Sequence, residues 1–186
     1  MLKGYPKVVV IDDGTRVTLR PMVAEDRERL IAFFQSIPEE ERWYLKEDVA
    51  DAEVIDSWVR CLDYERVLPI VAVVDDEIVA DATLHRRTYG GSRHVGKLRI
   101  VVSPKYRNKG MGTWMVMDIV NAALSGGVEK LMAEMVAGKQ EIAREGLRRV
   151  GFIEEAVISD YARDPDGVSH DLIMMTRTFY PDWGGF

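Results

Sequence analysis

Cysteine and histidine are scarce in this chain. Cys61 is its single cysteine, which excludes an internal disulfide and any metal site built from several cysteines, and which is compatible with a reducing cytoplasm. The three histidines, His85, His94 and His170, are scattered without the spacing of metal ligands. The sequence therefore predicts a protein that holds no metal.

Long apolar runs and a basic excess are missing as well. No run approaches the ~18 residues that span a bilayer, and the apolar stretch near the N-terminus is too short for a secretory signal. Lys and Arg number 25 against 31 Asp and Glu, a net charge of −6, whereas nucleic-acid-binding proteins normally carry a basic excess. We therefore expect a cytoplasmic protein without a membrane or nucleic-acid partner.

The hydrophobic pattern predicts a mixed α/β fold. The 186 residues are 47% apolar and show no repeat or long linker, so we expect one domain over residues 1–186, with a core at roughly 10–178. Helices are predicted at 24–34, 50–62, 113–124 and 140–150. Strands are predicted at 15–22, 67–74, 77–85, 97–102, 128–136, 153–161 and 170–178. This order lacks the strict strand–helix alternation of a doubly wound nucleotide-binding fold.

A cationic glycine turn, "RNKGMG" (107–112), joins the strand at 97–102 to an apolar helix. Unpaired N–H groups and the positive end of a helix dipole suit a phosphate, and Gly110 and Gly112 allow it to approach without a Cβ clash. A Walker loop is absent, and a dinucleotide fingerprint would need glycine where Met115 stands. The pattern R/Q-x-x-G-x-G fits at every position.

With this turn the chain resembles the GNAT superfamily of acyl-CoA-dependent N-acetyltransferases, in which R/Q-x-x-G-x-G/A binds the pyrophosphate of coenzyme A. "QEIAREGLRRVGF" (140–152) resembles a second family element, N-x-x-A-x-x-x-Y-x-x-x-G-F, with Gln140 for the Asn and Leu147 for the Tyr. Residues 13–45 are similar to the start of bacterial protein-lysine acetyltransferase domains, and "DPDGVSHDLIMM" is similar to the family's last hairpin.

The resemblance implies a GNAT-like twisted, mostly antiparallel sheet of about seven strands with helices on both faces. It also implies acetyl transfer from acetyl-CoA to a primary amine, with a protein lysine as the favoured acceptor, by a monomer or homodimer. The strand before the turn would pair with the pantetheine amides, and the turn would hold the pyrophosphate. The residues so assigned to coenzyme A are Ile100, Val101, Val102, Arg107, Asn108, Lys109, Gly110, Met111, Gly112, Thr113 and Gln140.

The catalytic residues are harder to assign. A lysine of pKa ~10.4 is neutral only about once in 2,500 molecules at pH 7, so a general base helps the reaction. Many members place a Glu on the strand that here carries Lys97 and Arg99, and Leu147 stands where a Tyr often acts as the acid.

Four residues are the candidates instead. Glu134 on the strand at 128–136 lies near a catalytic Glu of some members, displaced by one residue. Asp81 and His85 share a face of the strand at 77–85 with Thr83, although Asp81 can also pair across the sheet with Lys97 or Arg99. Tyr161 is a candidate acid or substrate contact, or an edge-strand aromatic. The missing acid and base leave open a module that binds acyl-CoA without turnover; a small-molecule acceptor and a dinucleotide-dependent enzyme are further alternatives.

Overall fold

A computed structural model describes residues 4–179, and the domain predicted over residues 1–186 extends beyond them at both ends. The strands are β1 (Lys7–Val10), β2 (Arg16–Pro21), β3 (Val67–Val74), β4 (Glu77–His85), β5 (Val95–Val102), β6 (Lys130–Val136), β7 (Ile153–Arg163) and β8 (Ser169–Thr178). The helices are α1 (Arg27–Gln35), α2 (Glu39–Arg42), α3 (Ala52–Arg60), α4 (Met111–Ser125) and α5 (Glu141–Arg149), with short 3₁₀ turns η1 (Ala24–Asp26) and η2 (Pro104–Tyr106).

The strands form one sheet in the order β1-β2-β3-β4-β5-β6-β8-β7. Neighbouring strands are antiparallel, except for β5 and β6, which run parallel because α4 crosses between them. The predicted mixed α/β fold with a mostly antiparallel sheet is confirmed. The sheet has eight strands rather than about seven because β1, with only the four residues KVVV, adds itself to the edge of β2.

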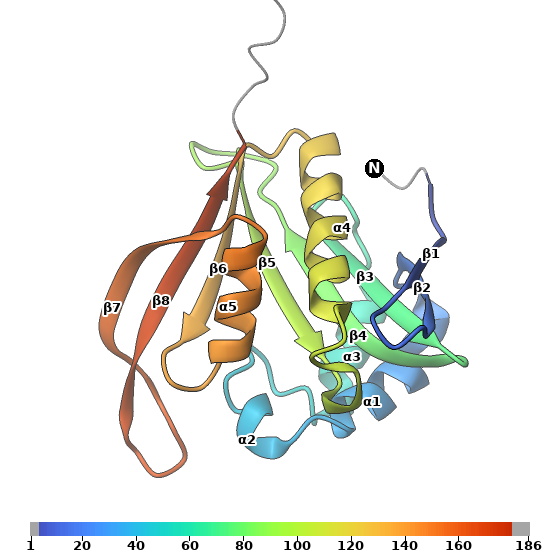
Figure 1. Cartoon of the computed structure of the whole chain (residues 1–186), viewed down its shortest axis with the longest axis horizontal. Coiled ribbons are helices and arrows are strands. Elements are labelled where there is room, and N and C mark those ends of the chain that lie inside the picture. The colour runs from blue at the N-terminus through green and yellow to red at the C-terminus, as the bar shows by residue number, and fades with distance from the viewer. Residues whose placement is uncertain (1–3, 180–186) are drawn as a thin grey trace, which may run out of the picture.

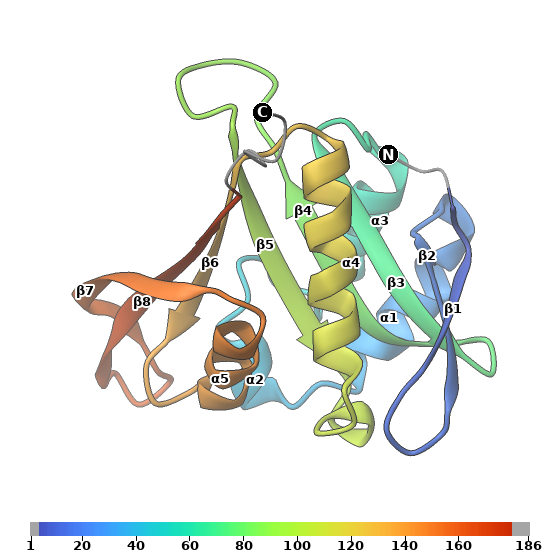
Figure 2. The same cartoon turned by 45° about the horizontal axis from the view of Figure 1, so that its top comes forward.

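Helices cover both faces of the sheet, as predicted. α4 and α5 lie in front of it and α1 and α3 behind it in Figure 1, and the turned view of Figure 2 shows the same layers. On the α4 side, Met111, Met115 and Ile119 are fully buried in a cluster with Leu84 and Leu98. A second cluster lies between the sheet and α1 and α3. It contains Leu30, Phe33, Phe34, Ile55 and Val71.

Local turns follow the residues that favour them. Asp75 and Asp76 both have positive φ (48° and 68°), which suits the predicted two-residue hairpin between β3 and β4. Gly151 has φ 85° and ends α5 as the expected left-handed residue. Asp118, one of the few polar residues of α4, is buried, and it binds Lys7 and Tyr5. β1 is thereby tied to the helix that begins at the glycine turn.

Two absences apply to residues 4–179. None of their helices combines the length and apolar character needed to cross a membrane. Their His, Cys, Asp and Glu side chains form no group of three or more that could hold a metal ion.

Candidate active site

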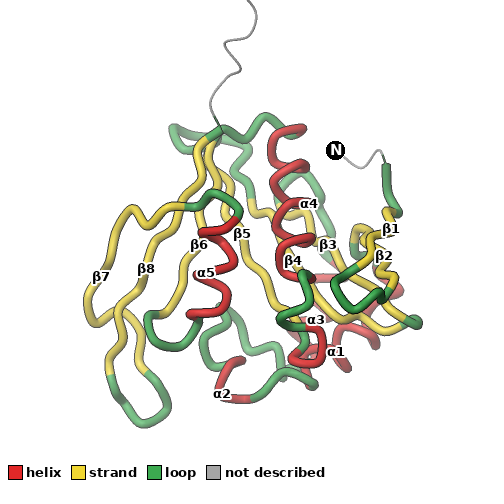
Figure 3. The backbone as a smooth tube through the Cα atoms, viewed as in Figure 1, coloured by secondary structure: helices red, strands yellow, loops and turns green. Residues whose placement is uncertain are grey.

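β5 and β6 pair over only three residues before they part. The pairs are Val95–Lys130, Gly96–Leu131 and Lys97–Met132. Beyond them β5 continues against β4 alone and β6 against β8 alone, so the two strands diverge down the sheet (Figure 3). We call this divergence the wedge, and its closed end at Lys97 and Met132 the apex.

The wedge exposes the backbone of a central strand. Ser103 N–H donates to Val79 O (2.9 Å), which turns the polar groups of alternate residues toward β4. By the same alternation, Ile100 and Val102 direct their N–H and C=O groups into the wedge and Val101 directs its groups toward β4. Within residues 4–179 both groups of Ile100 and the N–H of Val102 thus remain free for an extended amide chain, whereas Val102 C=O accepts from Arg107 Nε.

The chain leaves β5 directly into the loop that starts α4. Within residues 4–179, no group accepts a hydrogen bond from the backbone N–H groups of residues 108–113, whereas Arg107 N–H already donates to Pro104 O. These six donors lie at the N-terminus of a buried fifteen-residue helix, where its dipole is positive. The row of donors predicted at 107–113 is therefore confined to 108–113, which we call the phosphate loop.

The two glycines of the phosphate loop have different tasks. Gly110 has φ 79°, and a Cβ there would lie 3.0 Å from Asp12 Oδ1, so the turn itself requires glycine. A Cβ on Gly112 would meet nothing within 4 Å. The protein leaves open the space in front of Gly112, beside the free N–H groups, and an anion fits there.

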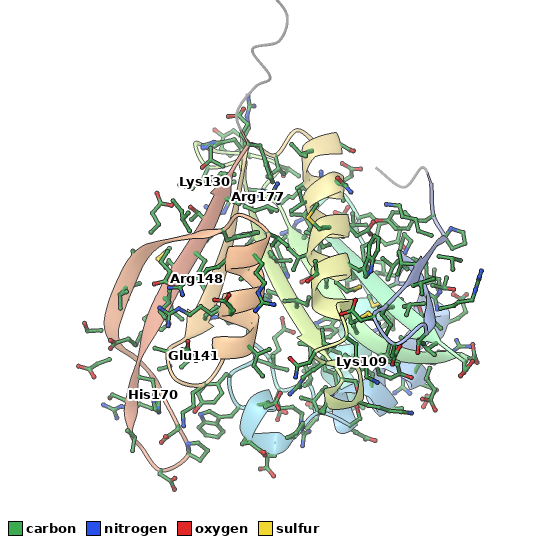
Figure 4. The ribbon with its side chains drawn as sticks, in the orientation of Figure 1. Lys109, Lys130, Glu141, Arg148, His170 and Arg177 are labelled. Atoms are coloured by element: carbon green, nitrogen blue, oxygen red, sulfur yellow. The ribbon has the colours of Figure 1, made fainter. Side chains whose placement is uncertain are left out.

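The cationic side chains of the loop are already paired. Arg107 binds both oxygens of Glu41 (2.7 and 2.6 Å) and donates from Nε to Val102 O (2.9 Å). Lys109, which projects from the loop in Figure 4, lies 3.0 Å from Asp13 Oδ2, and its carbonyl accepts from Asp12 N–H. The loop therefore offers an anion free backbone groups rather than free side-chain charge.

Glu134 lies at the apex. Its Oε1 accepts from Lys97 Nζ (2.7 Å), its Oε2 lies 2.9 Å from Lys46 Nζ, and its side chain is 14% exposed. Partial burial acts to raise the pKa of Glu134, but the hydrogen bonds from Lys97 and Lys46 outweigh it and hold the pKa below its ordinary value. The carboxylate is ionised at neutral pH and faces two amines.

These observations decide the family. The sequence profile described as "Acetyltransferase (GNAT) family" matches residues 15–152. The chain belongs to this family. As a GNAT protein it is an acyl-CoA N-acetyltransferase.

Solved GNAT structures share the fold at low sequence identity. The GNAT domain of S. lividans PAT is 16% identical (TM-score 0.77; 93% of this chain, 96% of that one). A protein from Salmonella typhimurium, named as an acetyltransferase and solved with its cofactor acetyl-CoA, is 15% identical (TM-score 0.75; 90% and 96%). Ribosomal-protein-alanine N-acetyltransferase from Brucella melitensis is 20% identical (TM-score 0.74; 87% and 99%). No curated protein matches significantly.

Asp81 lies on the α1 side of the GNAT sheet without an ion pair. Its partner on β5 is Val101, and its Oδ1 is buried with no hydrogen bond from the described residues. The expected pairing of Asp81 with Lys97 or Arg99 is wrong, because Lys97 binds Glu134 and the strand register sets Arg99 opposite Thr83. Burial raises the pKa of the Asp81 carboxyl to about 7.

His85 ends the same strand, opposite Lys97 and next to the apex. Its Nε2 lies 3.0 Å from Thr83 Oγ1. Burial, with the charges of Arg99 and Lys97, lowers the pKa of His85 to about 4, so the ring is neutral at pH 7. A neutral ring can accept or relay a proton. Arg99, whose charge lowers the pKa of His85, has its Nε buried without a hydrogen-bond partner among residues 4–179.

Two further predicted residues belong to neither β5 nor the phosphate loop. Tyr161 is 56% exposed on β7, the edge strand, which β8 separates from β6. Gln140 precedes α5, and its Oε1 accepts from Val136 N–H (2.8 Å) at the end of β6. Tyr161 thus lies on the outer strand of the sheet. Gln140 binds the Val136 N–H, which faces the wedge because the next N–H, that of Ala137, donates to Asp171 O on β8.

Sequence reasoning missed the contribution of residues 38–49, the α2 segment. In Figures 1 and 2 α2 lies at the open end of the wedge, between the ends of β5 and β6. Glu41 holds Arg107, Trp43 Nε1 donates to Arg163 O (2.7 Å) at the end of β7, and Lys46 reaches Glu134. The stretch "EEERWYLKED" has no apolar periodicity, so no pattern in it predicts these contacts.

Proposed function

We propose that this GNAT protein transfers the acetyl group of acetyl-CoA to a primary amine, with a protein lysine as the favoured acceptor. The observation that carries the proposal is the row of unpartnered N–H groups at 108–113, with open space at Gly112, directly below the free edge of β5. The pyrophosphate is a charged group that such a row accepts, and the pantetheine arm carries the amides that a free strand edge pairs with. The Salmonella typhimurium relative with acetyl-CoA supports the choice of cosubstrate.

A substrate arm that starts at the phosphate loop and follows β5 must end at the apex, because the strands close there. The free N–H groups of β5 then hold the thioester carbonyl, and they need no reorganisation as its oxygen gains charge. Glu134 accepts the proton of the attacking ammonium, directly or through water. Its lowered pKa makes it a weak base, so positioning supplies a large share of the rate enhancement.

The acceptor reaches the apex from the side of α1 and α2. A lysine side chain fits this approach, since the side chain of Lys46 already extends along it to Glu134. The similarity of residues 13–45 to protein-lysine acetyltransferase domains supports the same acceptor. A small amine is the second candidate, because 40% of the Lys46 side chain is exposed and a free amine can compete for its place.

Calorimetry and an acceptor panel test the proposal. We expect acetyl-CoA and coenzyme A to bind and NAD not to bind, and we expect dephosphorylated pantetheine to bind far more weakly. If pantetheine bound as tightly as coenzyme A, residues 108–113 would not be the pyrophosphate site. Coenzyme A release is then measured with lysine peptides and with small amines. Turnover with small amines alone would show that the acceptor is a small amine and not a protein lysine. If no amine supported turnover, the protein would bind acyl-CoA without transferring its acyl group.

A further inference from the structure

One amine of this chain already lies where the acceptor amine is expected. Lys46 follows α2 and extends from outside the sheet to Glu134 on β6, with its Nζ 2.9 Å from Oε2. Lys97, the other amine at Glu134, belongs to β5 and forms part of the wall of the wedge. Lys46 instead enters from the acceptor side, as an incoming substrate would.

The apex fixes how close this amine comes to the reacting group. Lys97 is the last β5 residue paired with β6, and its Nζ binds the same carboxylate at 2.7 Å. A substrate arm laid along the free edge therefore ends next to Glu134, whose Oε2 binds Lys46. Effective concentrations of groups held in this way greatly exceed those of free amines.

The segment that carries Lys46 is held between two apolar anchors. α2 itself has no buried side chain, but Leu45 packs against the second core cluster and Val49 is buried in it, so the backbone at Lys46 is fixed near Glu134. The Lys46 side chain is 40% exposed, so solvent reaches its amine. Other ion-paired lysines bind other carboxylates, as Lys109 does with Asp13 and Lys130 with Glu155.

We propose that Lys46 is an acetylation site of the protein itself, modified in cis by the wedge of the same molecule. The inference rests on the proposed acetyl transfer. The Lys46 Nζ gives up one proton to Glu134 or to water, and its lone pair forms a bond to the thioester carbonyl carbon. As the carbon–sulfur bond breaks, the nitrogen gives its second proton to the departing thiolate, so coenzyme A leaves as the thiol and Lys46 becomes Nε-acetyl-lysine. The product amide has no charge, so Glu134 keeps Lys97 as its remaining ion-pair partner at the apex.

The test follows acetylation of each lysine by peptide mass spectrometry after the full chain is mixed with acetyl-CoA. Lys105 is the matched control, because it is exposed and no carboxylate among the described residues pairs with it. Both lysines are exposed, so uncatalysed acetylation reaches both. We expect Lys46 to react at least about tenfold faster than Lys105, at a rate per molecule that does not change with protein concentration. Free coenzyme A in excess is expected to slow Lys46 and leave Lys105 unchanged.

Three results would overturn the inference: a Lys46 rate no higher than that of Lys105, a rate that rises with protein concentration, or a rate insensitive to coenzyme A. Acetylation of Lys97 in place of Lys46 would overturn it too. Coenzyme A release with an amine panel, measured in Lys46→Arg, separates this failure from failure of the proposed function. Transfer to an amine without acetylation of Lys46 in the natural chain leaves the proposed function intact. If no acceptor leads to release of coenzyme A, both the proposed function and the acetylation of Lys46 are wrong.

Discussion

The phosphate loop and the apex lie at opposite ends of one wedge, and they are built from different materials. The loop presents backbone N–H groups of six consecutive residues, while the cations beside it are held by Glu41 and Asp13. The apex presents side chains, with Glu134 between two lysines from distant parts of the chain. A cosubstrate that never changes can be bound by fixed backbone. Side chains on a polar segment allow the acceptor to differ between relatives that share the fold.

The largest effect is expected where the backbone itself is blocked. Gly112→Val places a branched Cβ in the open space beside the free N–H groups, so we expect acetyl-CoA affinity to fall at least ~10³-fold, about 4 kcal/mol. Calorimetry measures the change. Gly146→Val in α5 is the matched control, because it also adds its Cβ to a helix where nothing lies within 4 Å. If folded Gly112→Val bound acetyl-CoA normally, the phosphate loop would not be the part of the wedge that binds the cosubstrate.

A second prediction concerns the buried carboxyl of Asp81, which lowers the free energy of unfolding when it is ionised. Its pKa is about 7 in the folded protein, above the ordinary 3.8, so the folded state keeps a proton that the unfolded chain releases between these values. Stability therefore falls as pH rises through this window, by about 2–4 kcal/mol once the pH exceeds 7. We expect Asp81→Asn to recover this amount in urea unfolding near pH 8, and little near pH 4.

Glu77→Gln is the control for Asp81→Asn, because Glu77 is an exposed carboxyl on the same strand. If Asp81→Asn gained the same stability at both pH values, the pKa of Asp81 would not be raised in the folded protein. The loss of amine turnover in Asp81→Asn would in addition give this residue a part in the reaction.

Glu134→Gln separates the two ends of the wedge most directly. Removal of the proton acceptor is expected to lower kcat by about 10- to 100-fold, while the affinity for coenzyme A stays unchanged because the phosphate loop is intact. Initial rates and calorimetry are measured on the same protein. His85→Ala runs in parallel. Full turnover in Glu134→Gln with loss in His85→Ala would move the proton transfer to β4, and full turnover in both would leave catalysis to positioning.

The smallest effect is expected at the ion pair between Glu41 on α2 and Arg107 beside the phosphate loop. Glu41→Gln frees the Arg107 guanidinium to approach a phosphate, so acetyl-CoA affinity is expected to rise about two- to fivefold at low salt, a gain that salt screens. Calorimetry at two ionic strengths measures it. Glu40→Gln, a change at the adjacent acid, is the control. A loss of affinity in Glu41→Gln would show that the pair positions Arg107 for the ligand rather than occupying it.

Much of the fold follows from local pattern. The turns at Asp75–Asp76 and Gly151 depend on neighbouring residues, and so does the glycine turn, because its donors are consecutive in the chain. β1 escaped prediction because four residues that alternate between half-buried and exposed give a weak signal. The apex depends on strand register, which a sequence pattern fixes poorly. Opposite Asp81 the register places Val101, and it brings Lys97 to Glu134 on the neighbouring strand.

The single parallel pairing among the described strands gives β5 an unusual position. β5 lies in the middle of the strand order. From residue 98 to residue 102, however, it pairs with β4 alone and is hydrogen-bonded like an edge strand. Amide hydrogens of Ile100 and Val102 should therefore exchange with solvent at rates typical of a sheet margin, although four strands lie on one side of β5 and three on the other. The middle of this sheet is completed by whatever extended chain binds in it, so the ligand acts as its missing strand.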